Sequence, residues 1–368
     1  MTPVHRLLRS ELLLDLQKIR KMVMKPRYNI FPLLACMVLL LSCTRGSQAC
    51  DSSCEYAEFF DLKDSLLLVV SPYDGSTQSI SLDKPMSKII CMSSSQVAAL
   101  AQIGADSTVA AVSGLKYLTN QRIHERKCPD IGYEAVLDYE KILDINPDLL
   151  IAYTVAASEP QYLSKLRSLG IPVLVIYEHC ENHPLAKAEY VRLFGALTGK
   201  QYQADSCFRS VRDRYCELAD SVSKHDNEKL SVLMNIPYGD AWYIPGADNY
   251  MSRMINDAGG KVLGAKPGRN SSVVSLEKAY ALSQDADIWL NPGHCTMRQQ
   301  LSDIHHLFPT FGPLTKSLPI YNNTLRTNSE GGNDFWESGA VRPDLVLEDL
   351  VKIFSSHPGE LHYHLELK

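Results

Sequence analysis

Short apolar runs alternate with amphipathic segments along most of the chain. Segments 96–103 and 160–169 have the apolar spacing of short helices, and Gly170 ends the second one. Strands alternating with helices predict a mainly parallel sheet, because parallel strands need a crossover connection. The apolar runs that we interpret as buried strands are 88–92, 108–112, 149–153, 172–177, 230–234 and 285–291.

The strand-rich regions lie on either side of a polar segment, 184–222, that reads as helical with few breakers apart from Gly195 and Gly199. We therefore predict an α/β protein with two Rossmann-like lobes, each built on a central, mainly parallel sheet. A single long backbone helix would join the lobes and restrict how far they open. The predicted boundaries are 64–183 for the N-terminal lobe, 184–222 for the helix and 223–356 for the C-terminal lobe.

Two segments of the chain read as copies of one another, and they support the division into two similar lobes. Residues 137–152 and 275–290 each place a Glu-Lys pair at the start of an amphipathic turn, and each ends in an Asp before a buried strand. An acid in the first turn suits the positive end of a helix dipole. The repeat predicts that each lobe presents one carboxylate, Glu140 and Glu277.

The N-terminus has the pattern of an export signal. Residues 25–27 are Lys-Pro-Arg, residues 30–41 are mostly apolar, and 40–43 (Leu-Leu-Ser-Cys) resemble a bacterial lipobox. The apolar run is shorter than the ~20 residues that a spanning helix needs, although an uncleaved anchor is the alternative. We expect 1–42 to be a signal peptide, with 1–23 as a mis-called start, and Cys43 to be lipidated.

Segments on both sides of the lobes are predicted to lie outside the fold. Residues 43–63 would be a lipid-linked tether, and 357–368 a polar tail. None of the cysteines after Cys43 forms a CxxC pair, so a zinc ribbon is not expected. His305 and His306, with His294, are considered as metal ligands. Neighbouring side chains on a helix point apart, however, so we expect no metal site.

Charge and motifs exclude several function classes. A net charge of −5 argues against a nucleic-acid partner. The chain has no nucleophile elbow, no GxGxxG fingerprint and no P-loop, and Gly259-Gly260 follows a helix without completing such a motif. We therefore do not expect an enzyme.

An ordered set of local motifs carries a resemblance to a known family. The matching segments are 88–90 with 93–95, Glu140 with 146–151, 169–173, 242–246, 275–277, 333–339 and 341–347. With these segments the chain resembles, over roughly 64–355, the substrate-binding lipoproteins of ABC importers that carry iron–siderophore, haem or cobalamin complexes. The second Glu segment departs from the first, since two more residues precede its Asp.

The resemblance implies function, partners and location. Glu140 and Glu277 would each pair with an arginine of an ABC permease dimer, which works with an ATPase. The protein would be a monomer without an intrinsic cofactor, lipid-anchored in a bacterial cell envelope and facing the periplasm or the outer surface. Its ligand would be an Fe(III)-siderophore, with cobalamin or haem as alternatives. A surface interaction module without a transport role is the remaining alternative.

Aromatic and cationic residues in or beside predicted loops are the candidates for ligand contact. Aromatic planes suit large flat chelates or corrins, and a cation suits their acidic groups. The ligand-binding candidates are Trp242, Tyr243, Trp336, Arg342, Lys116 and Tyr117.

Overall fold

The computed structural model describes residues 54–225, 228–301, 309–313, 317–356 and 359–368, all within one compact unit that begins at Ser52. The predicted signal peptide, Cys43, His305 and His306 lie outside the described residues. Within the described part, every helix is either too short or too polar to cross a bilayer.

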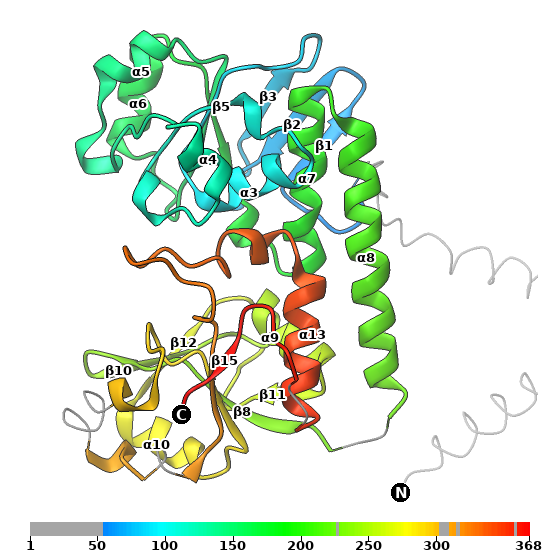
Figure 1. Ribbon diagram of the computed structural model, residues 1–368, viewed down its shortest axis with the longest axis vertical. Helices are drawn as coiled ribbons and strands as arrows, with labels where there is room; N and C mark the ends of the chain where they lie inside the picture. The colour runs from blue at the N-terminus through cyan, green and yellow to red at the C-terminus, as the bar shows by residue number, and fades with distance from the viewer. Residues whose placement is uncertain (1–53, 226–227, 302–308, 314–316, 357–358) are drawn as a thin grey trace, which may run out of the picture. The chain divides into compact units, whose positions relative to one another are not determined.

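The N-terminal lobe, at the top of Figure 1, is built on the predicted parallel sheet. Its strand order is β5-β4-β6-β7. Its strands are almost continuously apolar because helices cover them. The strands are β4 (Ile89–Cys91), β5 (Val109–Val112), β6 (Leu149–Tyr153) and β7 (Val173–Ile176), and the helices are α3 (Ser94–Gln102), α4 (Gln121–Glu125), α5 (Tyr139–Ile145) and α6 (Gln161–Ser168).

The N-terminal lobe begins earlier than predicted, so the tether boundary at residue 63 is wrong. The backbone N–H groups of Glu55, Tyr56 and Ala57 donate to the fully buried carboxylate of Glu189. Buried carboxylates thus hold this polar segment in place, which composition does not reveal. An antiparallel sheet follows, formed by β1 (Phe60–Lys63), β2 (Leu66–Val70) and β3 (Thr77–Ser81).

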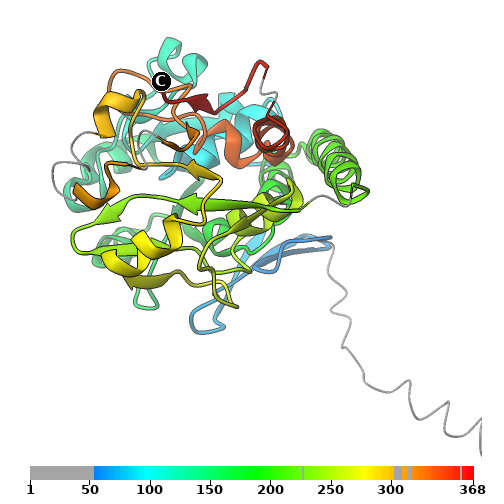
Figure 2. The ribbon, with the colours of Figure 1, turned by 90° about the horizontal axis from the view of Figure 1, so that it is seen from below.

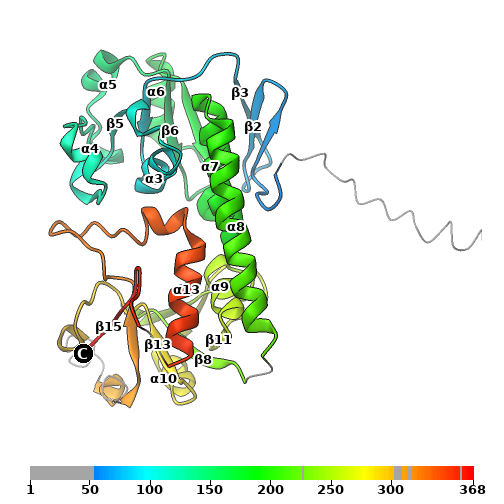
Figure 3. The same cartoon turned by 45° about the vertical axis from the view of Figure 1, so that its right-hand side comes forward.

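Two helices, not the predicted single one, connect the lobes: α7 (Pro184–Thr198) and α8 (Gln201–Ser223). Gly199 ends α7 in the left-handed region at φ 69°, where glycine is favoured. The helices then pack closely, since a Cβ on Gly195 would lie 2.4 Å from the Cβ of Ala204. α8 runs beside α7 and continues along the C-terminal lobe (Figures 1 and 3).

The C-terminal lobe has a five-stranded sheet of order β11-β8-β13-β14-β15, parallel except for the last strand. Seen from below, α13 lies beside α8 (Figure 2). The sheet contains β8 (Leu230–Met234), β11 (Gly260–Val262), β13 (Ile288–Leu290), β14 (Ile320–Asn322) and β15 (Leu365–Glu366); a smaller sheet contains β9 (Pro237–Tyr238), β10 (Ala241–Ile244) and β12 (Ser272–Ser275); the helices are α9 (Tyr250–Asp257), α10 (Leu276–Ser283) and α13 (Pro343–Phe354).

Short 3-10 helices complete the described elements of both lobes. Two of them, η2 and η7, adjoin the region where the lobes meet. They are η1 (Asp106–Thr108), η2 (Leu115–Tyr117), η3 (Glu134–Val136), η4 (Glu178–Cys180), η5 (Arg298–Leu301), η6 (Pro309–Phe311) and η7 (Ser338–Ala340).

The end of the chain belongs to the C-terminal lobe, so the predicted polar tail is wrong for residues 359–368. Tyr363 and His364 are buried, and β15 pairs with β14. Asp349 on α13 accepts hydrogen bonds from the N–H groups of His362, Tyr363 and His364, and its Oδ2 lies 3.0 Å from Nδ1 of His364. A buried polar network, invisible to an apolar pattern, holds this segment.

The repeat seen in the sequence is a structural repeat. Asp148, ahead of β6, accepts hydrogen bonds from the N–H groups of Ser87 and Lys88 beside β4. Asp287, ahead of β13, accepts one from Ser231 in β8. Each Asp therefore ties its strand to the neighbouring parallel strand. The prediction of two similar lobes is confirmed.

Candidate ligand-binding cleft

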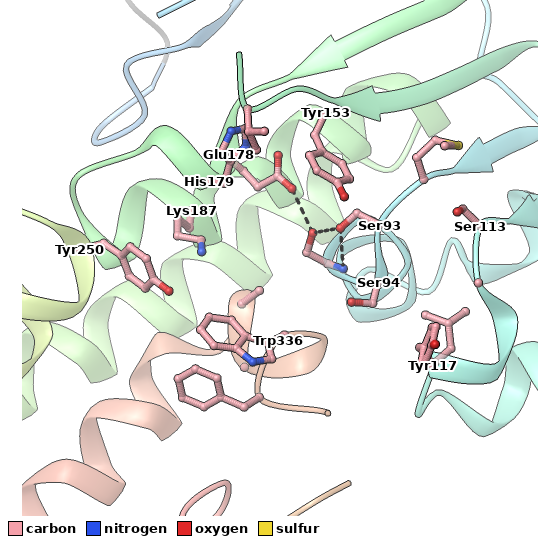
Figure 4. Close-up of a pocket in the computed structure, with 18 of the residues that line it drawn as sticks. Ser93, Ser94, Ser113, Tyr117, Tyr153, Glu178, His179, Lys187, Tyr250 and Trp336 are labelled. Atoms are coloured by element: carbon pink, nitrogen blue, oxygen red, sulfur yellow. Dashed lines mark hydrogen bonds between the residues drawn. The ribbon is translucent and has the colours of Figure 1, made fainter. Parts of the chain in front are cut away.

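The carboxyl ends of the four N-lobe strands open onto a cavity of about 760 Å³ between the lobes (Figure 4). Ser93 follows β4, Ser113 follows β5, Tyr153 ends β6 and Glu178 follows β7. In open α/β sheets, ligands bind outside the carboxyl ends of the strands. The polar wall of the cavity therefore lies where a ligand is expected.

Apolar and aromatic side chains form the opposite wall. Trp336 is 51% exposed and packs edge-on against Phe335, with ring centroids 4.8 Å apart. Tyr250 of α9 faces Lys187 of α7, whose Nζ lies 4.0 Å from the ring centroid. Figure 4 shows Tyr250 and Trp336 across the cavity from Ser93. The remaining apolar residues of this wall are Met251, Met254, Ala340, Pro343 and Val346.

A second cavity of about 430 Å³ extends the cleft into the C-terminal lobe. It shares Tyr250, Met251 and Trp336 with the first cavity. Asn235 and Asn291 follow β8 and β13, so these strands also direct their carboxyl ends toward the cleft.

The first cavity carries few charges. Among the residues that the structure describes, Lys187 is the one Lys or Arg that lines it, while Glu178 is buried and Glu134 is exposed. Burial lowers the pKa of His179, an effect that the nearby Glu178 partly offsets, so the imidazole is neutral at neutral pH. Among the described residues, no group of three or more His, Cys, Asp or Glu side chains gathers to hold a metal.

A set of hydrogen bonds, here called the interlobe clamp (Thr119, Asn120, Asn328 and Glu337), ties the lobes together beside the cleft. Glu337 accepts from the N–H groups of Thr119 and Asn120 at 2.6 and 3.0 Å. The Asn328 side chain donates to the carbonyl oxygens of Lys116 and Leu118. Burial raises the pKa of Glu337, partly offset by the bonds from Thr119. The clamp limits how far the lobes separate.

Two of the six predicted ligand residues line the cavity, namely Tyr117 and Trp336. Trp242 does not, and the prediction that it contacts ligand is wrong. It is fully buried on β10, stacks on Phe311 at 5.2 Å and donates from Nε1 to the Met234 carbonyl. The nearby Pro245-Gly246 indicates a loop at this position, but residues 241–244 form β10.

The other three candidates lie outside both cavities. Tyr243 is on the opposite, exposed face of β10 from Trp242. Arg342 pairs with Asp344 at 2.7 Å at the start of α13, which occupies its guanidinium. Lys116 is exposed, with Nζ 4.9 Å from the Tyr117 ring centroid.

Sequence reasoning missed most of the polar wall. Polar residues directly after a predicted strand were the available signal, and Ser93 was noted only as part of a family motif. The missed residues include Ser93, Ser95, Ser113, Tyr153, Glu178, Lys187 and Tyr250.

The two repeated glutamates occupy equivalent places. Glu140 and Glu277 are exposed in the first turns of α5 and α10, whose N-caps are Asp138 and Ser275. A hydrogen bond with the Ser275 side chain lowers the pKa of Glu277. Figure 1 places α5 and α10 toward the far ends of the two lobes, and neither glutamate lines a cavity of the cleft.

Known proteins match the chain at moderate identity. A lipoprotein of unassigned function from Methanocaldococcus jannaschii is 25% identical over 292 residues, which cover 75% of this chain and 66% of that protein. A protein named cobalamin-binding protein from Halobacterium salinarum is 25% identical over 233 residues, covering 63% and 61%. The chain thus spans slightly less than two thirds of these relatives.

Solved structures share the fold. A periplasmic haem-binding protein from Pseudomonas aeruginosa superposes with a TM-score of 0.59 at 17% identity, covering 77% of this chain and 98% of that one. The periplasmic vitamin B12-binding protein of Vibrio cholerae gives 0.52 at 14%, covering 75% and 99%. The model of the family described as periplasmic binding protein matches residues 89–305, more than half of the chain. The chain belongs to the periplasmic binding protein family.

Proposed function

We propose that this protein is the extracytoplasmic substrate-binding component of an ABC importer, and that it carries a corrinoid such as cobalamin. The observation that carries the ligand class is the cleft itself. It offers a polar wall and an aromatic wall, and within the described ranges Lys187 is the one Lys or Arg residue that lines it. A large, flat ligand of low net charge fits these walls. The relative named cobalamin-binding protein supports the same choice.

This proposal changes the order of ligands expected from the sequence, where an Fe(III)-siderophore came first. Anionic chelates favour sites with several cations. Arg342 and Lys116, the two cations expected at the site, lie outside the cavity, and the Arg342 guanidinium is paired with Asp344. Siderophore and haem are therefore alternative outcomes of the binding test.

Delivery to a permease dimer and its ATPase rests on the paired glutamates. Two exposed carboxylates at equivalent helix starts can orient the protein on a two-fold symmetric partner. Lipidation at Cys43 would keep the protein at the membrane where that permease lies. Cys43→Ser should release it from the membrane fraction or leave an uncleaved precursor; a mature-sized mutant still in the membrane fraction would contradict this anchor.

The test of the ligand is direct titration of purified residues 52–368. Cyanocobalamin, haemin and a ferric hydroxamate siderophore are added separately, and binding is followed by calorimetry and by quenching of tryptophan fluorescence. We expect cyanocobalamin to bind most tightly. Tighter binding of haemin or of the ferric siderophore would overturn the corrinoid proposal.

A further inference from the structure

The hydroxyl groups on the polar wall of the cleft form a relay with a fixed direction. Ser95 Oγ donates to Glu178 Oε1 at 3.0 Å, and Ser93 Oγ lies 2.6 Å from Ser95 Oγ. Figure 4 marks these hydrogen bonds with dashed lines between the labelled Ser93 and Glu178. A carboxylate can only accept, so the single proton of Ser95 points to Glu178. Ser93 must then give its own proton to Ser95.

Ser93 is left with acceptor capacity alone. Its oxygen also accepts the N–H of Ser95 at 3.2 Å, as the N-cap of α3. A hydroxyl has one proton and two lone pairs, so one lone pair of Ser93 remains, and the residue lines the cavity. The relay therefore presents an acceptor to whatever enters the cleft.

Glu178 places a negative charge behind the same wall. It is only 9% exposed, and its buried Oε2 has no hydrogen-bond donor among the described residues. Its carboxylate also stands at the first turn of α3, where it supplies the negative charge that a helix N-terminus favours. A second anion arriving with the ligand would be repelled there.

We propose that the relay of Ser93, Ser95 and Glu178 selects ligands that present hydrogen-bond donors, specifically carboxamide NH₂ groups, and discriminates against the corresponding carboxylates. This inference rests on the proposed function and narrows it. Corrinoids carry peripheral carboxamides, whereas haem carries propionates. A ligand carboxylate has no proton to donate, so the acceptors of the site stay unpaired when it replaces a carboxamide. Unpaired polar groups in a site discriminate strongly against such a ligand.

The test compares amide and acid forms of one scaffold. Cyanocobalamin and its monocarboxylic acid derivatives are titrated into the wild type, Glu178→Gln and Ser93→Ala. We expect the wild type to prefer cyanocobalamin over at least one acid by about 10-fold or more. Ser93→Ala should weaken cyanocobalamin binding by ~2–10-fold, and Glu178→Gln should reduce the amide preference to ~3-fold or less.

Glu125→Gln is the control, because Glu125 is an exposed carboxylate outside both cavities. It removes the same charge and should leave the preference unchanged. Equal binding of amide and acid by the wild type would overturn the proposal. So would a Glu125→Gln effect as large as that of Glu178→Gln.

One further measurement separates this proposal from the proposed function. If no corrinoid binds, the corrinoid assignment fails, and haemin is compared with its diamide. Tighter binding of the diamide supports the relay, and equal or weaker binding overturns it.

Discussion

The two lobes contribute to the cleft in different chemical terms although they repeat the same architecture. The N-terminal lobe lines the first cavity with hydroxyl groups and a buried carboxylate, which lie at the ends of four parallel strands. The C-terminal lobe reaches it through α9, α13 and the segment around Trp336, with mainly apolar side chains. A common fold thus leaves each lobe free to specialise, one in hydrogen bonding and the other in apolar contact.

The largest effect on stability is expected at Trp242, a residue that supports the fold and not the cleft. Trp242→Ala removes a fully buried side chain from the C-lobe core and should lower the free energy of unfolding by ~3–5 kcal/mol. Chemical denaturation measures this loss. If Trp242→Ala left the stability unchanged but abolished ligand binding, Trp242 would be a ligand contact and not a core residue.

Trp336 should show the converse behaviour. Trp336→Ala removes an exposed ring from the aromatic wall and should weaken ligand binding by ~1–3 kcal/mol, with little change in stability. Calorimetric titration gives the affinity. Trp336→Phe, which keeps an aromatic plane, is the control and should retain most of it; equal losses in both variants would argue against a plane-to-plane contact.

The lobes also differ in how they hold the ends of the folded unit. In the N-terminal lobe, Glu181 accepts the N–H groups of Glu58 and Phe59, and burial raises its pKa to about 7. In the C-terminal lobe, burial alone would raise the pKa of Asp349, but hydrogen bonds from His364 and the backbone outweigh it and lower the pKa. A buried carboxylate holds each end, but the stability that it contributes changes in opposite directions with pH.

This contrast predicts the pH dependence of stability. The contribution of Glu181 is fully present below its unfolded pKa and is lost as pH rises through about 7, roughly 2–3 kcal/mol between pH 5 and pH 8. That of Asp349 is present above its unfolded pKa of about 3.9 and is lost as pH falls through its lowered folded value. Denaturation across pH tests both, and Glu181→Gln should flatten the neutral range. A slope unchanged in Glu181→Gln would contradict the first assignment.

The smallest effect on the purified protein is expected at the repeated glutamates. Glu140→Ala combined with Glu277→Ala should change stability by no more than ~1 kcal/mol per site and leave ligand affinity unaltered, because both side chains are exposed and outside the cavities. Uptake by cells should nevertheless fall sharply, and reversal to Arg should be worse. Full uptake, or a parallel loss of affinity, would contradict docking.

The parts of the fold that follow from apolar patterning could be predicted. The six strands expected from apolar runs are present, and Cys91 is buried in β4 as a strand residue should be. The single backbone helix was wrong because Gly199, an ordinary helix-ending signal, was discounted in a long polar segment.

The parts that depend on long-range polar contacts could not be predicted from patterning. Asp349 accepts hydrogen bonds from three N–H groups of residues 362–364. The composition of that segment is typical of a solvated tail. Trp242 and Tyr243 are adjacent in sequence, yet strand geometry sends one into the core and the other to the surface. Glu178 belongs to the site because β7, which precedes it, pairs with β6. A local sequence pattern does not reveal this pairing.

The interlobe clamp and α8 together determine how the two lobes can separate. α8 joins the lobes covalently along one side, while the hydrogen bonds of Glu337 join them beside the cleft. A partner docked at Glu140 and Glu277, as proposed, would have to break these bonds and those of Asn328 to move the lobes apart, whereas the covalent connection through α8 would stay intact. Release of a ligand by lobe separation would therefore cost the hydrogen bonds of one buried carboxylate and one side-chain amide.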